Sequence, residues 1–226
     1  MKSINDVCFL IMARNNSQRV KNKATRKFGD STLFDIAVNK FIDSNIIPNE
    51  QIYLTVHGDT LVSMANKYKK FGVNVHERTD ESVTEEASLQ DIYQIYKDVD
   101  YKYFVEINIC SYMLSVKTID DFIKNYLKIS YDGYFGVTEK INYYWDENQN
   151  FLLDVQGKYM DTKKAKFLYE ASHSLYAGRL SDIDRGIHMG TFSKKNDPAL
   201  YIVSEEESFD IDHEWQFEIG QRIYGQ

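Results

Sequence analysis

The chain has 226 residues, a formal net charge of −7 and an apolar fraction of 43%. This length and apolar content predict a buried core within a single domain over residues 1–226. The acidic balance argues against nucleic acid as a partner, because phosphate backbones attract basic surfaces. No run approaches the roughly 18 apolar residues that a membrane span needs. Cys8 and Cys110 lack metal-ligand spacing and fit buried thiols, so we expect a cytoplasmic protein.

Apolar strands and amphipathic helices alternate along the first 140 residues. Residues 7–13, VCFLIMA, carry no charge and predict a buried strand of a parallel sheet. A helix is expected over residues 31–44, with Asp30 or Ser31 as its N-cap. We then expect, in chain order, a strand at 51–56, a helix at 59–72 closed by Gly72, a strand at 73–78, a helix at 85–99, a strand at 102–109, a helix at 116–128 and a strand at 131–139.

This order predicts an α/β fold, namely a Rossmann-like, mostly parallel sheet with helices on both faces, plus a β-rich excursion. Ligands of such sheets bind beyond the carboxyl ends of the strands. The excursion covers about 140–170, includes a hairpin that turns at 147–150, and could form a dimerisation arm or a lid. A strand at 199–204 and a helix that begins near residue 211 follow.

A basic loop follows the first strand. Residues 12–23, MARNNSQRVKNK, bring together cations, amides and a hydroxyl, which suit phosphate oxygens. The loop has neither the G-x-x-x-x-G-K-[ST] nor the G-x-G-x-x-G spacing of other phosphate-binding loops. Charge alone leaves a solvated basic turn as an equal alternative. The candidate nucleotide-binding residues of this loop are Arg14, Asn15, Asn16, Ser17, Gln18, Arg19 and Lys23.

The stretch ARNNSQRVKNK resembles the signature loop of the cytidylyltransferases that make CMP-activated acidic sugars. That loop reads A-R-x-G-S-[KR]-x-x-x-x-K, or A-R-x-x-S-x-R in the branch that activates KDO, and the matching positions here are Arg14, Ser17, Arg19 and Lys23. The resemblance implies a nucleotide-diphospho-sugar transferase-like fold and a CTP triphosphate bound by this loop, with catalytic roles for Arg14 and Lys23. Asn15 and Asn16 replace a frequent Gly-Gly, and Gln18 replaces a frequent Lys.

Other segments extend the resemblance over most of the chain. Arg78 and Ser88 fall in the region where the family contacts cytosine. In place of the family's L-Q-P-T-S-P-L-R the chain has INICSYML, where Asn108 matches the Gln and Ser111 the Ser, but the proline turn and its Arg are missing. His173 matches a stretch that touches the sugar. The resemblance therefore implies substrate-binding roles for Asn108, Ser111 and His173.

The last matching segment is SFDIDHEWQFEIGQ. Its Asp210 and Asp212 match the two family aspartates that hold Mg²⁺, and Asp212 is also a predicted catalytic residue. The chemistry agrees, because Mg²⁺ prefers hard oxygen ligands, often one or two carboxylates completed by phosphate and water. The alternative is an acidic helix start, in which Asp212 and Glu214 would only favour the helix dipole.

Together these features predict a Mg²⁺-dependent cytidylyltransferase. It would transfer CMP from CTP to the anomeric hydroxyl of an acidic 2-keto sugar of the sialic, legionaminic, pseudaminic or KDO type, and release pyrophosphate. The resemblance also implies a homodimer that pairs through the excursion. Two alternatives stay open: a metal-dependent glycosyltransferase of similar fold, and a nucleotide-binding protein that has lost turnover.

Overall fold

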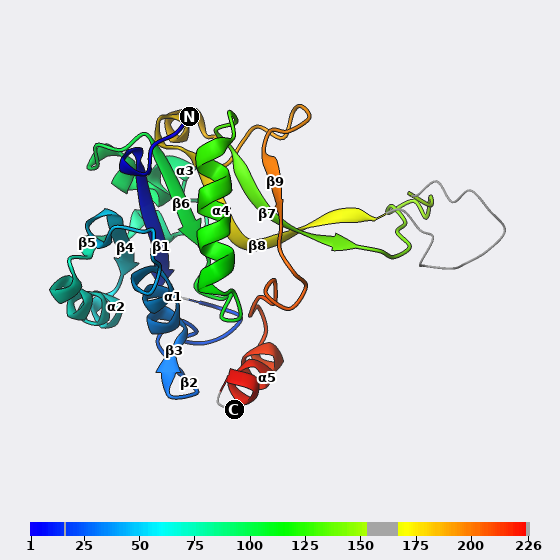
Figure 1. Ribbon diagram of the computed structural model, residues 1–226. Helices are drawn as coiled ribbons and strands as arrows, with labels where there is room; N and C mark the ends of the chain where they lie inside the picture. The colour runs from blue at the N-terminus through cyan, green and yellow to red at the C-terminus, as the bar shows by residue number, and fades with distance from the viewer. Residues whose placement is uncertain (16, 153–166, 225–226) are drawn as a thin grey trace.

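The computed structural model describes residues 1–15, 17–152 and 167–224 and shows a seven-stranded sheet flanked by helices (Figure 1). The strand order is β5-β4-β1-β6-β8-β7-β9. β8 pairs antiparallel with both β6 and β7, whereas the other neighbouring pairs in the described sheet are parallel. The predicted mostly parallel α/β fold is thus confirmed. The strand bounds are β1 Val7–Arg14, β4 Ile52–His57, β5 Asn74–Glu77, β6 Tyr103–Ile107, β7 Tyr134–Lys140, β8 Leu168–Arg179 and β9 Ala199–Ile202.

The helices other than α3 lie close to their predicted positions. They are α1 Leu33–Ile42, α2 Asp59–Asn66, α3 Leu89–Ile92, α4 Val116–Lys128 and α5 Glu214–Tyr224. α2 continues as the 3-10 turn η3 (Lys67–Phe71), which ends at Gly72 with a φ of 87°, as the prediction of a glycine C-terminus requires. α4 matches the predicted helix at both ends.

Two local predictions are wrong. The helix expected over 85–99 is only the single turn α3 followed by the 3-10 turn η5 (Gln94–Lys97), because Tyr93 leaves the helical conformation at φ −103° and ψ 33°. The N-cap of α1 is Thr32, and neither Asp30 nor Ser31 caps the helix. The Thr32 hydroxyl accepts from the Asp35 backbone N–H at 3.0 Å.

Alternate residues of β1 face two hydrophobic clusters, as expected for a central strand covered on both sides. Phe9 and Ile11 belong to the larger cluster, to which α1, α2, α4 and α5 contribute. Cys8 and Leu10 belong to the smaller cluster, with η5 and the 3-10 turn η7 (Leu180–Arg185). Among the described residues, no helix combines the length and apolar character that crossing a bilayer requires.

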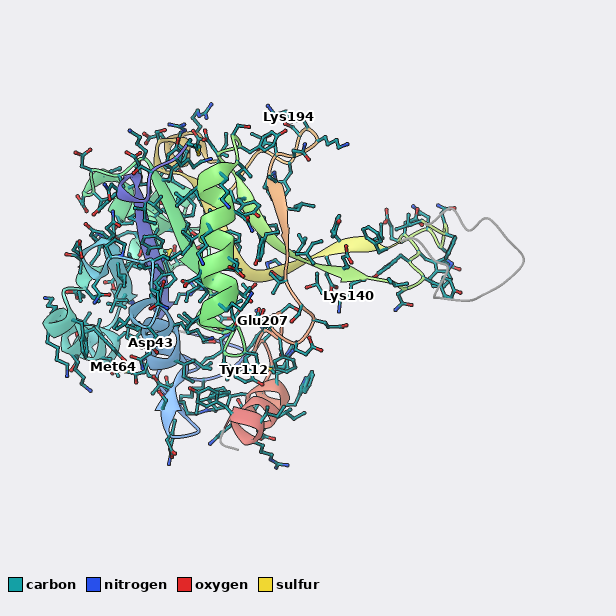
Figure 2. The ribbon with its side chains drawn as sticks, viewed as in Figure 1. Asp43, Met64, Tyr112, Lys140, Lys194 and Glu207 are labelled. Atoms are coloured by element: carbon teal, nitrogen blue, oxygen red, sulfur yellow. The ribbon has the colours of Figure 1, made fainter. Side chains whose placement is uncertain are left out.

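The excursion leaves the sheet as an extension of β7 and β8, which project from the body together (Figure 1). Lys140, labelled in Figure 2, pairs with Leu168 at the far end of the described ladder. Beyond it Trp145 and Phe151 form an antiparallel bridge, which fits the predicted turn at 147–150. Residues 153–166 of the excursion lie outside the described residues. Its role as a lid or as the arm of a homodimer stays a prediction.

Aromatic packing attaches α5 to the body. Phe217 is 1% exposed and meets Phe28 edge-to-face with ring centroids 5.1 Å apart. Tyr112, labelled near α5 in Figure 2, packs on Phe28 at 4.9 Å. The Arg26 guanidinium lies 3.7 Å from the centre of the Phe217 ring, a cation–π distance. This packing fixes the position of the acidic segment that directly precedes α5.

We predict that Phe217→Ala lowers the free energy of unfolding by about 3–5 kcal/mol, because it leaves a cavity under α5. Urea unfolding followed by circular dichroism measures this change. The matched control is Trp215→Ala on the same helix, where the side chain is 56% exposed and should contribute at most about 0.5 kcal/mol. Equal effects of the two substitutions would show that Phe217 does not anchor the helix.

Candidate functional site

The basic loop leaves the carboxyl end of β1 and borders a cleft of about 420 Å³. β1 is flanked there by the parallel strands β4 and β6, so the loop lies at the sheet edge where ligands of such folds bind. The cleft is lined by Met12, Ala13, Arg14, Ser17, Gln18, Arg19, Lys23, Ala24, Val83, Glu85 and Ile109. The loop candidates Arg14, Ser17, Gln18, Arg19 and Lys23 therefore border it. Asn16 lies outside the described residues, and Asn15 accepts a hydrogen bond from Thr25 at 3.1 Å.

Two side chains join the basic loop to the D-x-D segment, residues 210–212, near the other end of the chain. The Arg19 guanidinium donates to Asp212 Oδ1 at 2.7 Å. Lys23 Nζ donates to the Ile211 carbonyl at 2.5 Å and lies 3.9 Å from Asp212 Oδ1. A third pair, Arg26 with Glu214 at 2.6 Å, reinforces the junction. The predicted cationic turn and the predicted carboxylates therefore share one side of the molecule.

Asp210 has an unusual environment for a carboxylate. Its Oδ1 is buried and has no hydrogen-bond partner among the described residues. Burial raises its pKa, the negative charge of Asp212 adds to the rise, and Lys23 opposes it. A buried carboxylate oxygen without a partner is costly unless a cation or a donor completes it.

Asp210 and Asp212, the acidic pair, offer only two carboxylates as possible ligands of a metal ion. The described residues contain no group of three or more His, Cys, Asp or Glu side chains arranged to hold a metal ion. A structural zinc site would need such a group, whereas Mg²⁺ commonly takes one or two protein carboxylates and completes its shell with phosphate and water. The free oxygen of Asp210 and the part-exposed carboxylate of Asp212 fit that second pattern.

Gln216 fixes the backbone of the acidic segment. Its Oε1 accepts from the backbone N–H groups of Asp212 and His213, both at 2.7 Å. These N–H groups lie at the start of α5, where they have no partner within the helix. A glutamine reaching back from the first turn is one half of a capping box. The sequence pattern was not used to predict this role, although a Gln three residues after His213 is a signal for it.

Arg14 lies between the first cleft and a second one of about 500 Å³. Its Nη1 donates to the Val83 carbonyl at 2.7 Å. Across the loop, Gln18 Nε2 donates to Glu85 Oε1 at 2.8 Å, a partner that sequence reasoning did not identify. The second cleft is lined by Met12, Ala13, Arg14, Arg78, Ser82, Thr84, Glu85, Ala87, Ile92, Tyr93 and Glu106. Met12, Ala13, Arg14 and Glu85 line both clefts.

The two residues predicted to contact the base have different surroundings. Arg78 is 8% exposed, lines the second cleft and donates to the Ser82 carbonyl at 2.7 Å. Ser88 is the N-cap of α3 and forms a capping box with Asp91, while its neighbour Ala87 lines the cleft. The structure thus gives Ser88 a helix-capping role next to the cleft.

The predicted acceptor-binding residues lie at the end of β6 and in β8. Asn108 Nδ2 donates to the His173 carbonyl at 3.0 Å, and its Oδ1 accepts from the Cys110 backbone N–H. His173 is exposed, has a positive φ of 51°, and its charge interacts with Asp210. Asn108 and His173 therefore lie together near the acidic pair. Ser111 is 1% exposed, with a hydroxyl that has no partner among the described residues, so it lies beneath this surface.

A partly buried lysine supports the turn that follows Asn108. Lys40 Nζ donates to the carbonyls of Ser111 and Tyr112 at 2.7 and 2.8 Å. Burial lowers the pKa of Lys40 to about 7, and the charge of Glu207 opposes the shift. The missing proline turn of the family pattern is therefore replaced by a turn held from α1. Nothing in the spacing of Lys40 marked it as a partner of residues 111–112.

Comparison with known proteins identifies the family. A family model described as cytidylyltransferase matches residues 8–218. The chain belongs to the cytidylyltransferase family and is thus a nucleotidyltransferase, as the loop and D-x-D resemblance predicted. A comparison with curated proteins gives no match.

Solved structures with the same fold include the following three, and the names of the first two proteins state their reactions. A CMP:2-keto-3-deoxy-manno-octonic acid synthetase complexed with CTP has a TM-score of 0.69 and 10% identity, over 97% of this chain and 98% of that one. A 4-diphosphocytidyl-2C-methyl-D-erythritol synthase from Anaerococcus prevotii has a TM-score of 0.66 and 10% identity, over 97% and 96%. A cytidylyltransferase from Leptospira borgpetersenii has a TM-score of 0.57 and 15% identity, over 94% and 84%.

We predict that Gln216→Ala speeds amide hydrogen exchange at Asp212 and His213, because both N–H groups lose their acceptor, and costs about 1 kcal/mol of stability. Gln216→Glu keeps an acceptor oxygen and should retain the protection. Exchange measured by NMR separates the two variants. Unchanged exchange at both amides in the alanine variant would contradict the capping role.

Proposed function

We propose that the protein transfers CMP from CTP to the anomeric hydroxyl of an acidic 2-keto sugar and releases pyrophosphate, with Mg²⁺ as its cofactor. One observation carries the proposal: the basic loop after β1, which lines the first cleft, is joined to the segment that carries Asp210 and Asp212 through Arg19 and Lys23. A triphosphate and a divalent cation need this combination of opposite charges. The neighbour with the highest TM-score of those described above was solved with CTP, which supports the same ligand here.

The loop residues would bind the phosphates. Arg14 and Arg19 offer guanidinium groups that can grip phosphate oxygens in two places, and Lys23 offers a point charge. Arg19 is 62% exposed and can exchange its contact with Asp212 for phosphate at little cost, because exposed ion pairs contribute little. Lys23 is 15% exposed and already positioned by the Ile211 carbonyl.

Asp210 and Asp212 would hold the Mg²⁺ ion. The strongest structural support for this assignment is the buried Oδ1 of Asp210, which has no hydrogen-bond partner in the described part of the chain. When bound, the ion neutralises phosphate charge and lowers the pKa of the attacking hydroxyl. Lys23 interacts with both carboxylates and thereby limits their mutual repulsion.

The acceptor would lie beside the acidic pair. Asn108 and His173 border this region and are the side chains we assign to acceptor contacts. The acidic sugar as acceptor rests on the loop resemblance and on the synthetase named for 2-keto-3-deoxy-manno-octonic acid. The fold alone serves more than one acceptor, since a methylerythritol synthase shares it. The family match favours nucleotidyl transfer over the glycosyltransferase alternative.

We predict that Asp212→Asn lowers pyrophosphate release from CTP by roughly 10²–10³-fold, because the amide is a poor ligand for Mg²⁺ yet still accepts from Arg19. The assay supplies CTP, Mg²⁺ and, in turn, sialic acid, legionaminic acid, pseudaminic acid and KDO. Circular dichroism checks that the variant is folded.

The matched control is Asp121→Asn on α4. The Asp121 side chain has the same exposed fraction as that of Asp212, 37%, and one short ion pair, with Lys117 at 2.6 Å. Its ion pairs are with Lys117 and Lys124 of the same helix and not with the basic loop, so the substitution should leave the rate unchanged. Full activity of the folded Asp212→Asn variant would refute the metal assignment. Release with none of the four acids, despite CTP binding, would refute the acceptor class.

A further inference from the structure

A buried carboxylate lines the second cleft and has no role in the phosphate or metal chemistry. Glu106 lies near the carboxyl end of β6 and is 8% exposed. It follows Phe104 by two residues and so shares the face of the sheet that η5 and η7 cover. Burying an ionised carboxylate is costly unless hydrogen bonds and counter-charges compensate it. The Glu106 carboxylate in this cleft therefore needs a hydrogen-bond donor or a positive charge as its partner.

Only one of the two Glu106 carboxylate oxygens accepts a hydrogen bond from the described residues. Oε2 accepts from the Tyr93 hydroxyl at 2.6 Å and lies 3.5 Å from His188 Nε2. Tyr93 is 6% exposed, and burial together with the Glu106 charge raises its pKa, so it remains a donor. No hydrogen bond from the described residues reaches Oε1. Tyr93 thus fixes the carboxylate and leaves one acceptor oxygen for a ligand in the cleft.

A donor without a partner lines the same cleft. Arg78 is 8% exposed, and its Nε is buried with no hydrogen-bond partner among the described residues. Its charge interacts with that of Glu106, but no hydrogen bond links the two side chains in the described structure. The second cleft therefore presents one unused acceptor and one unused donor, both on buried side chains.

A nucleotide on the basic loop would place its base in this cleft. The two clefts share the lining residues Met12, Ala13, Arg14 and Glu85. The amino group of cytosine donates hydrogen bonds, whereas its ring N3 and O2 accept them. Uracil instead carries an accepting O4 and a donating N3–H. A carboxylate oxygen that faces the cytosine amino group accepts a hydrogen bond from it. The same oxygen facing O4 of uracil would have no donor and would be repelled by the O4 dipole.

We propose that Glu106 is the specificity-determining residue that distinguishes CTP from UTP, by accepting a hydrogen bond from the cytosine amino group on Oε1. The assignment rests on the proposed use of CTP. Arg78 Nε donates to the acceptor side of the same base. Glu85 is a poorer candidate, because it is exposed and its Oε1 already accepts from Gln18.

The test compares the affinities of Mg²⁺–CTP and Mg²⁺–UTP for the wild-type protein and for Glu106→Gln, by isothermal titration calorimetry. In the variant the amide oxygen continues to accept from Tyr93, so the NH₂ group faces the base. The preference for CTP over UTP should fall by roughly 10-fold to 100-fold, with weaker CTP binding and stronger UTP binding. No acceptor sugar is present, so an error in the acceptor class does not affect the result.

The control is Glu139→Gln, an exposed carboxylate on β7 outside both clefts, which should change neither affinity. If Glu106→Gln weakens CTP and UTP equally, Glu106 is structural and the proposal fails while the use of CTP stands. If the wild type binds neither nucleotide, the proposed function fails as well. If Glu106→Gln does not fold, the double variant Glu106→Leu/Tyr93→Phe is used instead. It removes the carboxylate together with the hydroxyl that donates to it, and it should likewise lower the preference for CTP over UTP.

Discussion

The hydrogen bond from Lys23 to the Ile211 carbonyl is the contact on which the site depends. It joins the loop after the first strand to a segment near the end of the chain, and no pattern in either segment alone requires them to meet. Lys23 is largely buried, so its charge is weakly screened and acts on both Asp210 and Asp212. The neighbouring Arg19–Asp212 pair is exposed and contributes little to stability. Lys23 thus holds the two segments together, whereas the Arg19–Asp212 pair can open at little cost.

Packing places the carboxylates where these cations can reach them. Phe217 buries its ring against Phe28 and fixes α5 on the body. Gln216 then holds the two backbone N–H groups that precede the helix, so the turn carrying Asp212 has a defined course. Aromatic burial under α5 thus fixes the position of the Asp212 carboxylate. A weakened α5 would be expected to disturb the site before it unfolds the sheet.

The sequence predicted most of the elements and the position of the basic loop after β1, for identifiable reasons. α4 was predicted at both ends because its apolar spacing is regular, and β1 because seven uncharged residues in a row suit a strand covered on both faces. The interruption at Tyr93 was not predicted, since the helical spacing of Leu89, Ile92 and Ile95 continues across it.

What could not be predicted depends on contacts between distant segments. The antiparallel direction of β8 follows from its pairing with β6 and β7, which a reading of local periodicity does not contain. Glu106 looked like an ordinary strand residue until the fold placed Tyr93 and Arg78 around it. Local structure adds a role for Ser88 that the family resemblance did not indicate. The resemblance predicts a contact with the base, and in the structure the Ser88 hydroxyl caps α3.

In the proposed function, one triphosphate lies between the basic loop and the acidic pair. NMR line broadening by Mn²⁺, added in place of Mg²⁺ with and without CTP, measures this arrangement. With CTP present, Mn²⁺ is expected to broaden the amide signals of Ser17 and Arg19 together with those of Ile211 and Asp212. Broadening confined to one of the two segments in the presence of CTP, or located elsewhere, would contradict it.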